Sequence, residues 1–321
     1  MNVTKDGFKN RQLHIENYLQ MVSAEQKEYA EVFAHQRIAE NNDIITDFQT
    51  DSLMEKILHK DNLNKAYKKV KSNKGAGGVD GMSVDELLYF LKDNQKQLIQ
   101  RIKDGKYKPN PVRRVEIPKE TKGEFRKLGV PTVVDRVFQQ AFTQVLSPIY
   151  EKQFSENSFG FRPNKGAHDA LKQCQTNVND GYVYVVDMDL EKFFDTVCQS
   201  KLIEVLSRTI KDGQVISLIH KYLNAGVISR GMFEKTEVGM PQGGPLSPLL
   251  SNIMLNELDK ELTRRGHRFV RYADWYYVKK KYKLNVNFFN NIPYSYTALS
   301  SISFNSFQYP LSYSFGDKYP Q

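Results

Sequence analysis

Residues 182–195 read Tyr-Val-Tyr-Val-Val-Asp-Met-Asp-Leu-Glu-Lys-Phe-Phe-Asp. The apolar run, rich in β-branched and aromatic residues, predicts a buried strand over 182–190. Because side chains alternate along a strand, Asp187 and Asp189 share one face at its end. Burying two carboxylates there is costly unless a cation neutralises them, and Mg²⁺ prefers such oxygen ligands. An exposed strand end with acidic turn residues is the alternative.

A second stretch, at 239–252, reads Gly-Met-Pro-Gln-Gly-Gly-Pro-Leu-Ser-Pro-Leu-Leu-Ser-Asn. Its glycines and prolines dictate a tight backbone path that opens a helix running to about Arg265. Exposed backbone amides and the positive end of a helix dipole therefore lie close together. The length and order of this pattern distinguish it from a generic loop.

Two further stretches carry candidate chemistry. Residues 268–274 predict a strand that places Asp274 at a hairpin tip, as another Mg²⁺ ligand or merely a turn residue. Residues 112–117 predict a strand of a basic hairpin. Across that hairpin Lys119 and Arg126 could clamp a phosphate chain, although a solvated basic hairpin would have the same sequence.

Composition limits the function classes. The 321 residues are 40% apolar, which gives room for two domains and excludes wholesale disorder. The sequence contains no apolar run of membrane-spanning length and no secretory signal at its start, and its two cysteines form no metal or disulfide pattern. We therefore expect a cytoplasmic protein without a membrane association.

The positive charge is concentrated in two blocks. The net charge is +9, and residues 101–127 carry ten Lys and Arg against four acidic residues. Residues 260–283 carry nine against two. Two such blocks indicate two walls of a groove for a polyanion, or two solvated faces.

Periodicity places the remaining elements. Helical spacing predicts helices over 11–40, 52–71, 83–101, 135–150 and 199–224, with a flexible glycine loop at 75–78. Residues 288–321 keep no period and are aromatic and poor in charge. They are interpreted as sequence not selected for this fold, with an ordinary β-rich extension as the alternative.

In this order the four stretches resemble one family, the reverse transcriptase/maturase encoded by bacterial group II introns. Further support comes from Asn-Lys-Gly-Ala-Gly-Gly-Val-Asp-Gly-Met at 73–82, Pro-Thr-Val-Val-Asp-Arg at 131–136 and Ser-Phe-Gly-Phe-Arg-Pro at 158–163. The resemblance covers about residues 50–274. It implies RNA-templated DNA synthesis, coupled to intron splicing and mobility.

The resemblance implies a role for each matching residue. Asp189 and Asp274 would ligate two Mg²⁺ ions, and Lys119 and Arg126 would grip the incoming triphosphate. Phe194 would exclude a ribose 2′-hydroxyl, and Gln242 would position the nucleotide or template. The implied RNA contacts are Arg113, Arg114 and Arg162, of which Arg162 could instead brace the junction of fingers and palm. The implied partners are intron RNA, an RNA template with a DNA primer, and deoxynucleoside triphosphates.

One departure stands out, because the family pattern Tyr-Ala-Asp-Asp here ends in Asp274-Trp275. The resemblance also stops after Asn287, before the family's thumb. We therefore expect an α+β right-hand fold with fingers, an incomplete antiparallel palm with packed helices, and no thumb. The expected segments are an N-terminal helical extension (1–50), fingers with the start of the palm (51–180), a partial palm (181–287) and an aberrant tail (288–321).

The expected function is an RNA-directed DNA polymerase in a truncated copy with impaired catalysis. Two alternatives remain open at this point. One is an intron RNA-binding protein without catalysis, and the other is a remnant without function.

Overall fold

The computed structural model describes residues 53–118, 125–182, 184–190, 192–280 and 302–305, so 1–50, Lys119 and most of 288–321 lie outside the described residues. Its helices are α2 (Leu53–Leu58), α3 (Lys60–Ser72), α4 (Leu87–Lys103), α5 (Val133–Glu151), α6 (Ala167–Asn179), α7 (Phe193–Thr196), α8 (Gln199–Thr209), α9 (Gly213–Leu223) and α10 (Ser247–Arg264). Its strands are β1 (Val112–Pro118), β2 (Phe125–Val130), β3 (Tyr184–Leu190), β4 (Val227–Ser229), β5 (Met232–Glu234), β6 (Arg268–Tyr272), β7 (Trp275–Lys280) and β8 (Ile302–Asn305). The fold is mixed α and β, as expected.

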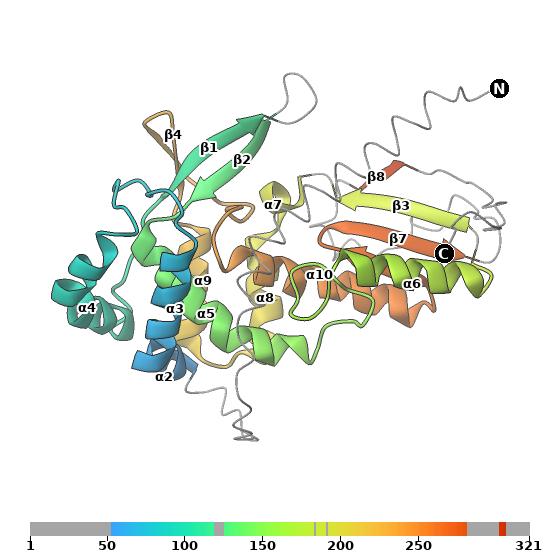
Figure 1. The fold of residues 1–321 in the computed structure, drawn as a ribbon, viewed down its shortest axis with the longest axis horizontal. Helices are drawn as coiled ribbons and strands as arrows, with labels where there is room; N and C mark the ends of the chain where they lie inside the picture. The colour runs from blue at the N-terminus through green and yellow to red at the C-terminus, as the bar shows by residue number, and fades with distance from the viewer. Residues whose placement is uncertain (1–52, 119–124, 183, 191, 281–301, 306–321) are drawn as a thin grey trace, which may run out of the picture.

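The first sheet, called here the fingers sheet, has the strand order β2-β1-β4-β5. The predicted hairpin is confirmed, because β1 and β2 pair antiparallel with Ile117 opposite Arg126. Figure 1 shows this hairpin standing above α3 and α5 at one end of the molecule. Since β4 joins β1 in parallel, a segment more than a hundred residues later fixes the base of the hairpin.

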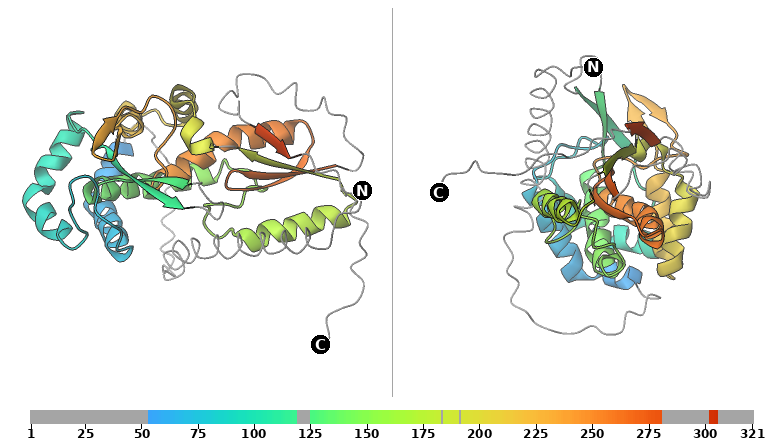
Figure 2. Two further views of the ribbon diagram at one scale, coloured as in Figure 1. Left: turned by 90° about the horizontal axis from the view of Figure 1, so that it is seen from above. Right: turned by 90° about the vertical axis from the view of Figure 1, so that its right-hand side faces the viewer.

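The second sheet, called the palm sheet, has the order β6-β7-β3-β8, and its neighbouring strands are all antiparallel. Met188, Phe269 and Tyr276 from three of its strands are fully buried. Figures 1 and 2 show this sheet at the other end of the molecule, with α10 running beneath it. The palm sheet therefore rests on a helix that is itself buried on nearly every turn.

Three observations correct the sequence interpretation. The helix expected over 199–224 divides into α8 and α9, because the Asp212 carboxylate caps α9 and also accepts from the Met54 backbone N–H at 2.8 Å. Residues 302–305, expected to lie in an aberrant tail, form β8 and pair with β3. Helix α6, over Ala167–Asn179, was not expected from the sequence.

None of the helices in the described part of the chain is long and apolar enough to cross a membrane.

The glycine loop at 75–78 was expected to be flexible, and the structure shows it packed. The Arg113 guanidinium donates to the Gly77 carbonyl at 2.8 Å, and Arg136 donates to the Ala76 carbonyl at 2.5 Å. A Cβ on Gly78 would lie 2.6 Å from the Thr132 Cα. These glycines therefore serve close backbone approach to the start of α5.

Candidate active site

A tight hairpin presents Asp274. Strands β6 and β7 pair up to Tyr272 opposite Trp275, which leaves Ala273 and Asp274 as the two turn residues. Ala273 has a φ of 55°, in the left-handed region that two-residue hairpin turns require. The Asp274 side chain is half-buried. The prediction that Asp274 sits at a hairpin tip is confirmed.

The β3–β7 ladder brings the two candidate ligands together. Asp189 lies opposite Trp275, and Trp275 directly follows Asp274. Residues far apart in the sequence thus meet at one end of the palm sheet. This is the place where the resemblance predicts a pair of metal-binding carboxylates.

A buried polar network lies beneath the hairpin. The Arg271 and Asp259 side chains are both fully buried, and the guanidinium binds the carboxylate from Nε at 2.9 Å and from Nη2 at 2.7 Å. Its Nη1 donates to the Asn252 side-chain oxygen at 2.7 Å and to the Ala273 carbonyl at 3.0 Å. Burial alone would lower the pKa of Arg271, but the Asp259 carboxylate outweighs it and the pKa is raised. Arg271 is therefore a permanent cation.

The segment 158–163 packs against the same turn. The Phe159 N–H donates to the Arg271 carbonyl at 2.9 Å, and the Asn252 side chain donates to the Gly160 carbonyl at 2.9 Å. A Cβ on Gly160 would overlap the backbone nitrogen of Ala273. Only glycine fits here, which explains its place in the Phe-Gly-Phe-Arg-Pro motif.

Arg162 lies inside the molecule. Its side chain is 2% exposed, and it pairs with Glu151 at 2.5 Å. It also donates to the Ser155 and Ser158 carbonyls at 2.5 and 2.8 Å. Because these internal partners occupy its guanidinium, the geometry favours the bracing role of Arg162 over the expected RNA contact.

The loop at 239–244 connects the palm to the fingers. The Met240 N–H donates to the Phe194 carbonyl at 2.7 Å, next to the half-buried ring of Phe194. At the other side, the Gly129 N–H donates to the Gln242 carbonyl at 2.6 Å. A Cβ on Gly243 would lie 2.7 Å from the Gly129 carbonyl oxygen. The loop therefore fixes Phe194 and the β2 strand relative to each other.

Two predicted nucleotide-binding residues contact each other. With the Gln242 amide oxygen facing Arg126, the guanidinium donates to it from Nη2 at 2.6 Å and from Nε at 3.2 Å. Arg126 is half-buried on β2, and Lys119 lies outside the described residues. The Arg113 guanidinium donates to the Gly77 carbonyl. The next residue on β1, Arg114, is half-buried.

The second basic block is partly neutralised from within. Lys260 pairs with Glu257, and Arg264 and Arg265 pair with Glu261, at 2.6–2.7 Å. Together with the buried Arg271, four of the nine cations have acidic partners on α10. The expected second wall of a basic groove is therefore weaker than its composition indicated.

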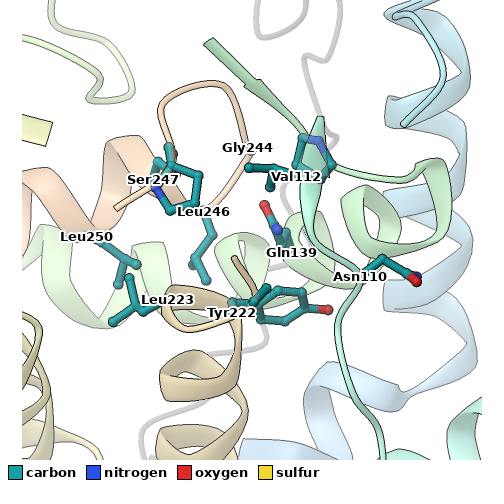
Figure 3. A pocket seen from close by; sticks show the side chains of 12 residues that line it. Asn110, Val112, Gln139, Tyr222, Leu223, Gly244, Leu246, Ser247 and Leu250 are labelled. Atoms are coloured by element: carbon teal, nitrogen blue, oxygen red, sulfur yellow. The ribbon is translucent and has the colours of Figure 1, made fainter. Parts of the chain in front are cut away.

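A pocket lies behind the loop at 239–244, where the loop meets α5 and α9 (Figure 3). Gln139, Tyr222 and Ser247 are among its lining residues. A Cβ on Gly244 would overlap the Gln139 amide oxygen, so the loop presses directly on α5. The pocket is thus a packing feature of the junction between fingers and palm.

The residues fit a divalent cation only in part. Asp274 lies in the turn, the backbone of Asp189 lies opposite Trp275, and the nearby Arg271 is already compensated by Asp259. The reverse transcriptase family generally uses divalent metal ions. Within the described residues, no group of three or more His, Cys, Asp or Glu side chains is gathered as a metal site. Carboxylate oxygens are the ligands that Mg²⁺ prefers, and the family pattern has a further carboxylate where this chain has Trp275.

Sequence reasoning missed Asn252, Asp259 and Arg271. A signal was present, because Asn252 and Asp259 are seven residues apart in a predicted helix and so share one face. Arg271 likewise interrupts an apolar strand. Polar residues on core-facing positions of two neighbouring elements indicate a buried pair.

Comparison with known proteins identifies relatives. The family model described as reverse transcriptase (RNA-dependent DNA polymerase) matches residues 117–282. The chain is 38% identical over 236 residues to the group II intron-encoded protein LtrA of Lactococcus lactis subsp. cremoris, covering 74% of this chain and 39% of that protein. It is 40% identical over 200 residues to protein YkfC of Escherichia coli strain K12, covering 60% of this chain and 52% of that protein.

A third relative is the putative COX1/OXI3 intron 2 protein of Saccharomyces cerevisiae. The identity is 38% over 208 residues, covering 62% of this chain and 23% of the relative. The chain thus spans 23–52% of the length of these curated relatives.

Proposed function

Because this chain belongs to the reverse transcriptase (RNA-dependent DNA polymerase) family, we propose that its palm site binds an RNA template, a DNA primer and a deoxynucleotide with Mg²⁺. The proposed function is that of a group II intron RNA-directed DNA polymerase, active in intron splicing and mobility. Its catalysis is impaired by Trp275.

The observation that carries this proposal is the β3–β7 register. It brings Asp189 within one cross-strand step of the turn that holds Asp274. The chemistry that Mg²⁺ supplies when bound by these carboxylates is activation of the primer 3′-hydroxyl and stabilisation of the leaving pyrophosphate. Two-metal chemistry needs enough negative charge to hold both cations, and the indole of Trp275 removes one carboxylate.

The nucleotide would lie between the fingers hairpin and the loop at 239–244. Arg126 would bind the triphosphate, and the Gln242 amide would hold its guanidinium in place. Phe194 would lie beneath the sugar, because the loop fixes the α7 backbone at that position. A bulky ring there excludes a 2′-hydroxyl by overlap.

A binding experiment tests this site without requiring turnover. A dideoxy-terminated primer on an RNA template is mixed with the protein, and the complex is followed by mobility shift. The next complementary deoxynucleotide should stabilise the complex in Mg²⁺ more than a mismatched one does. Asp189→Asn and Asp274→Asn should remove that difference. An unchanged difference in both variants would contradict the proposed metal ligands.

The same assay tests Phe194. The wild-type chain should prefer the complementary deoxynucleotide to the ribonucleotide, and Phe194→Val should reduce that preference. An unchanged preference would assign the ring to the core alone.

Trp275 itself favours a second function, RNA binding without catalysis. The cations of the fingers hairpin would then hold intron RNA through its backbone and folded shape. The mobility-shift assay separates the two functions, because a protein that only binds RNA would not be stabilised more by the complementary deoxynucleotide than by a mismatched one.

A further inference from the structure

The Arg271 side chain connects four parts of the palm. It binds Asp259 and Asn252 on α10, belongs to β6, and donates to the Ala273 carbonyl in the turn. Through Asn252, the same network holds the Gly160 carbonyl of the segment that packs on the turn. The network therefore holds the turn in two ways: directly at the Ala273 carbonyl, and through the segment at 158–163 that packs on the turn.

A turn with this φ value needs such support. Ala273 is not a glycine, and its φ of 55° is sparsely populated by residues with a Cβ. The hydrogen bond from Arg271 to its carbonyl fixes the peptide that leads into Asp274. The position of Asp274 is thus defined by atoms that lie outside the metal site.

The ion pair between Arg271 and Asp259 also compensates the positive charge that lies near Asp274. Arg271 lies close enough to Asp274 for the two charges to interact. Asp259 occupies the guanidinium through a forked contact at 2.7 and 2.9 Å. Without Asp259, Arg271 would be left as a buried cation that still interacts with Asp274, the proposed metal ligand.

We propose that Arg271, held by Asp259 and Asn252, is the positioning residue of the catalytic turn: it fixes the Ala273 carbonyl so that Asp274 is presented to a divalent cation. The part of this inference that concerns a divalent cation rests on the proposed function. The part that concerns the fixed backbone of the turn does not depend on it.

The chain contains a built-in probe, because Trp275 is its only tryptophan and directly follows Asp274. Quenching of Trp275 fluorescence by acrylamide reports how firmly the turn is held in the metal-free protein. Emission from Tb³⁺, excited through Trp275 at a wavelength that tyrosine does not absorb, reports cation binding beside Asp274. Tb³⁺ prefers carboxylate oxygens, and Mg²⁺ should compete with it.

The informative variant is the double replacement Asp259→Leu with Arg271→Met. Replacing both members of a buried ion pair by apolar residues of similar volume commonly preserves folding, whereas removing one leaves a buried charge. The double variant should unfold at a temperature close to that of the wild type. It should nevertheless show stronger acrylamide quenching, and Tb³⁺ affinity about 10- to 100-fold lower, because the carbonyl contact is gone.

Two more variants complete the design. Arg271→Lys keeps the charge but gives up the fork, so it should weaken Tb³⁺ binding in the same direction. The matched control is Glu257→Leu with Arg208→Met, which removes the ion pair between α10 and α8 by the same chemical changes. The control should leave both fluorescence readouts unchanged.

The outcomes separate this inference from the proposed function. A folded Asp259→Leu, Arg271→Met protein with wild-type quenching and wild-type Tb³⁺ affinity would overturn the positioning role. Wild-type Tb³⁺ emission that survives Asp189→Asn and Asp274→Asn would instead contradict the metal site. In that case stronger quenching in the double variant would still support the role of Arg271 in holding the turn.

Discussion

Trp275 lies directly opposite Asp189 in the β3–β7 ladder, one residue beyond the turn residue Asp274. The departure from the family pattern therefore falls at the centre of the candidate site. The palm strands, the turn and its buried support are all formed around it. The site thus combines an intact scaffold with one missing carboxylate.

Restoring that carboxylate should restore a second cation site. We expect the wild-type chain to bind about one Mn²⁺ ion tightly and Trp275→Asp to bind about two, because two-metal sites need both carboxylates of the turn. Electron paramagnetic resonance of free Mn²⁺ gives the count. Trp275→Asn, which is polar but uncharged, is the control. Equal stoichiometry in wild type and Trp275→Asp would contradict this assignment.

Gly160→Ala should be strongly destabilising. The added methyl would overlap the Ala273 backbone, which cannot move without shifting the turn. Overpacking of this kind costs about 1–3 kcal/mol or more of unfolding free energy. Gly213→Ala is the control, because no atom lies within 4 Å of its added Cβ. Urea unfolding measures the unfolding free energy of both variants. Equal values for Gly160→Ala and Gly213→Ala would show that the segment at 158–163 can move aside to accommodate the methyl group.

Arg126 and Gln242 should act as a unit in nucleotide binding. Their hydrogen bonds, at 2.6 and 3.2 Å, pre-orient the guanidinium, so replacing either residue by alanine loses the same contact. The double variant should therefore bind nucleotide more tightly than the sum of the single losses predicts, with a coupling of about 1 kcal/mol. If the losses of binding free energy in the two single variants simply add up to the loss in the double variant, the contact between Arg126 and Gln242 plays no part in nucleotide binding.

RNA binding should depend on the fingers hairpin. Arg114→Ala should lower RNA affinity and reduce the slope of log affinity against log salt by about one. Arg208→Ala on α8 serves as the control. Filter binding at several salt concentrations measures both slopes. An Arg114→Ala slope equal to that of the wild type would remove this residue from the interface.

Local signals in the sequence predicted the elements that make the site. The apolar run before Leu190 and the turn chemistry around Asp274 predicted β3 and the hairpin, and both are confirmed. The two acidic residues could be placed together only through the family resemblance, because the register between strands as distant in sequence as β3 and β7 leaves no local trace.

Charge counting overstated the second basic block for a definable reason. The block at 260–283 looked unpaired because Glu257 and Asp259, the partners of Lys260 and Arg271, lie just before its first residue. Helical i, i+3 pairing and burial neutralise cations that composition counts as available. The glycines at 75–78 predicted a flexible loop for a related reason. Only the packed structure shows which neighbouring atoms occupy the space that a Cβ would need at these positions.

The most direct test of the central claim is primer extension on an RNA template with Mg²⁺ and deoxynucleotides, using the unmodified chain beside Asp189→Asn. We predict that the two proteins incorporate nucleotide at the same background level, although the unmodified chain binds the primer–template. A misplaced reacting group can cost about 100-fold in rate, and Trp275 also removes a metal ligand. Incorporation by the unmodified chain that disappears in Asp189→Asn would contradict the account, because it would show a working two-metal site despite Trp275.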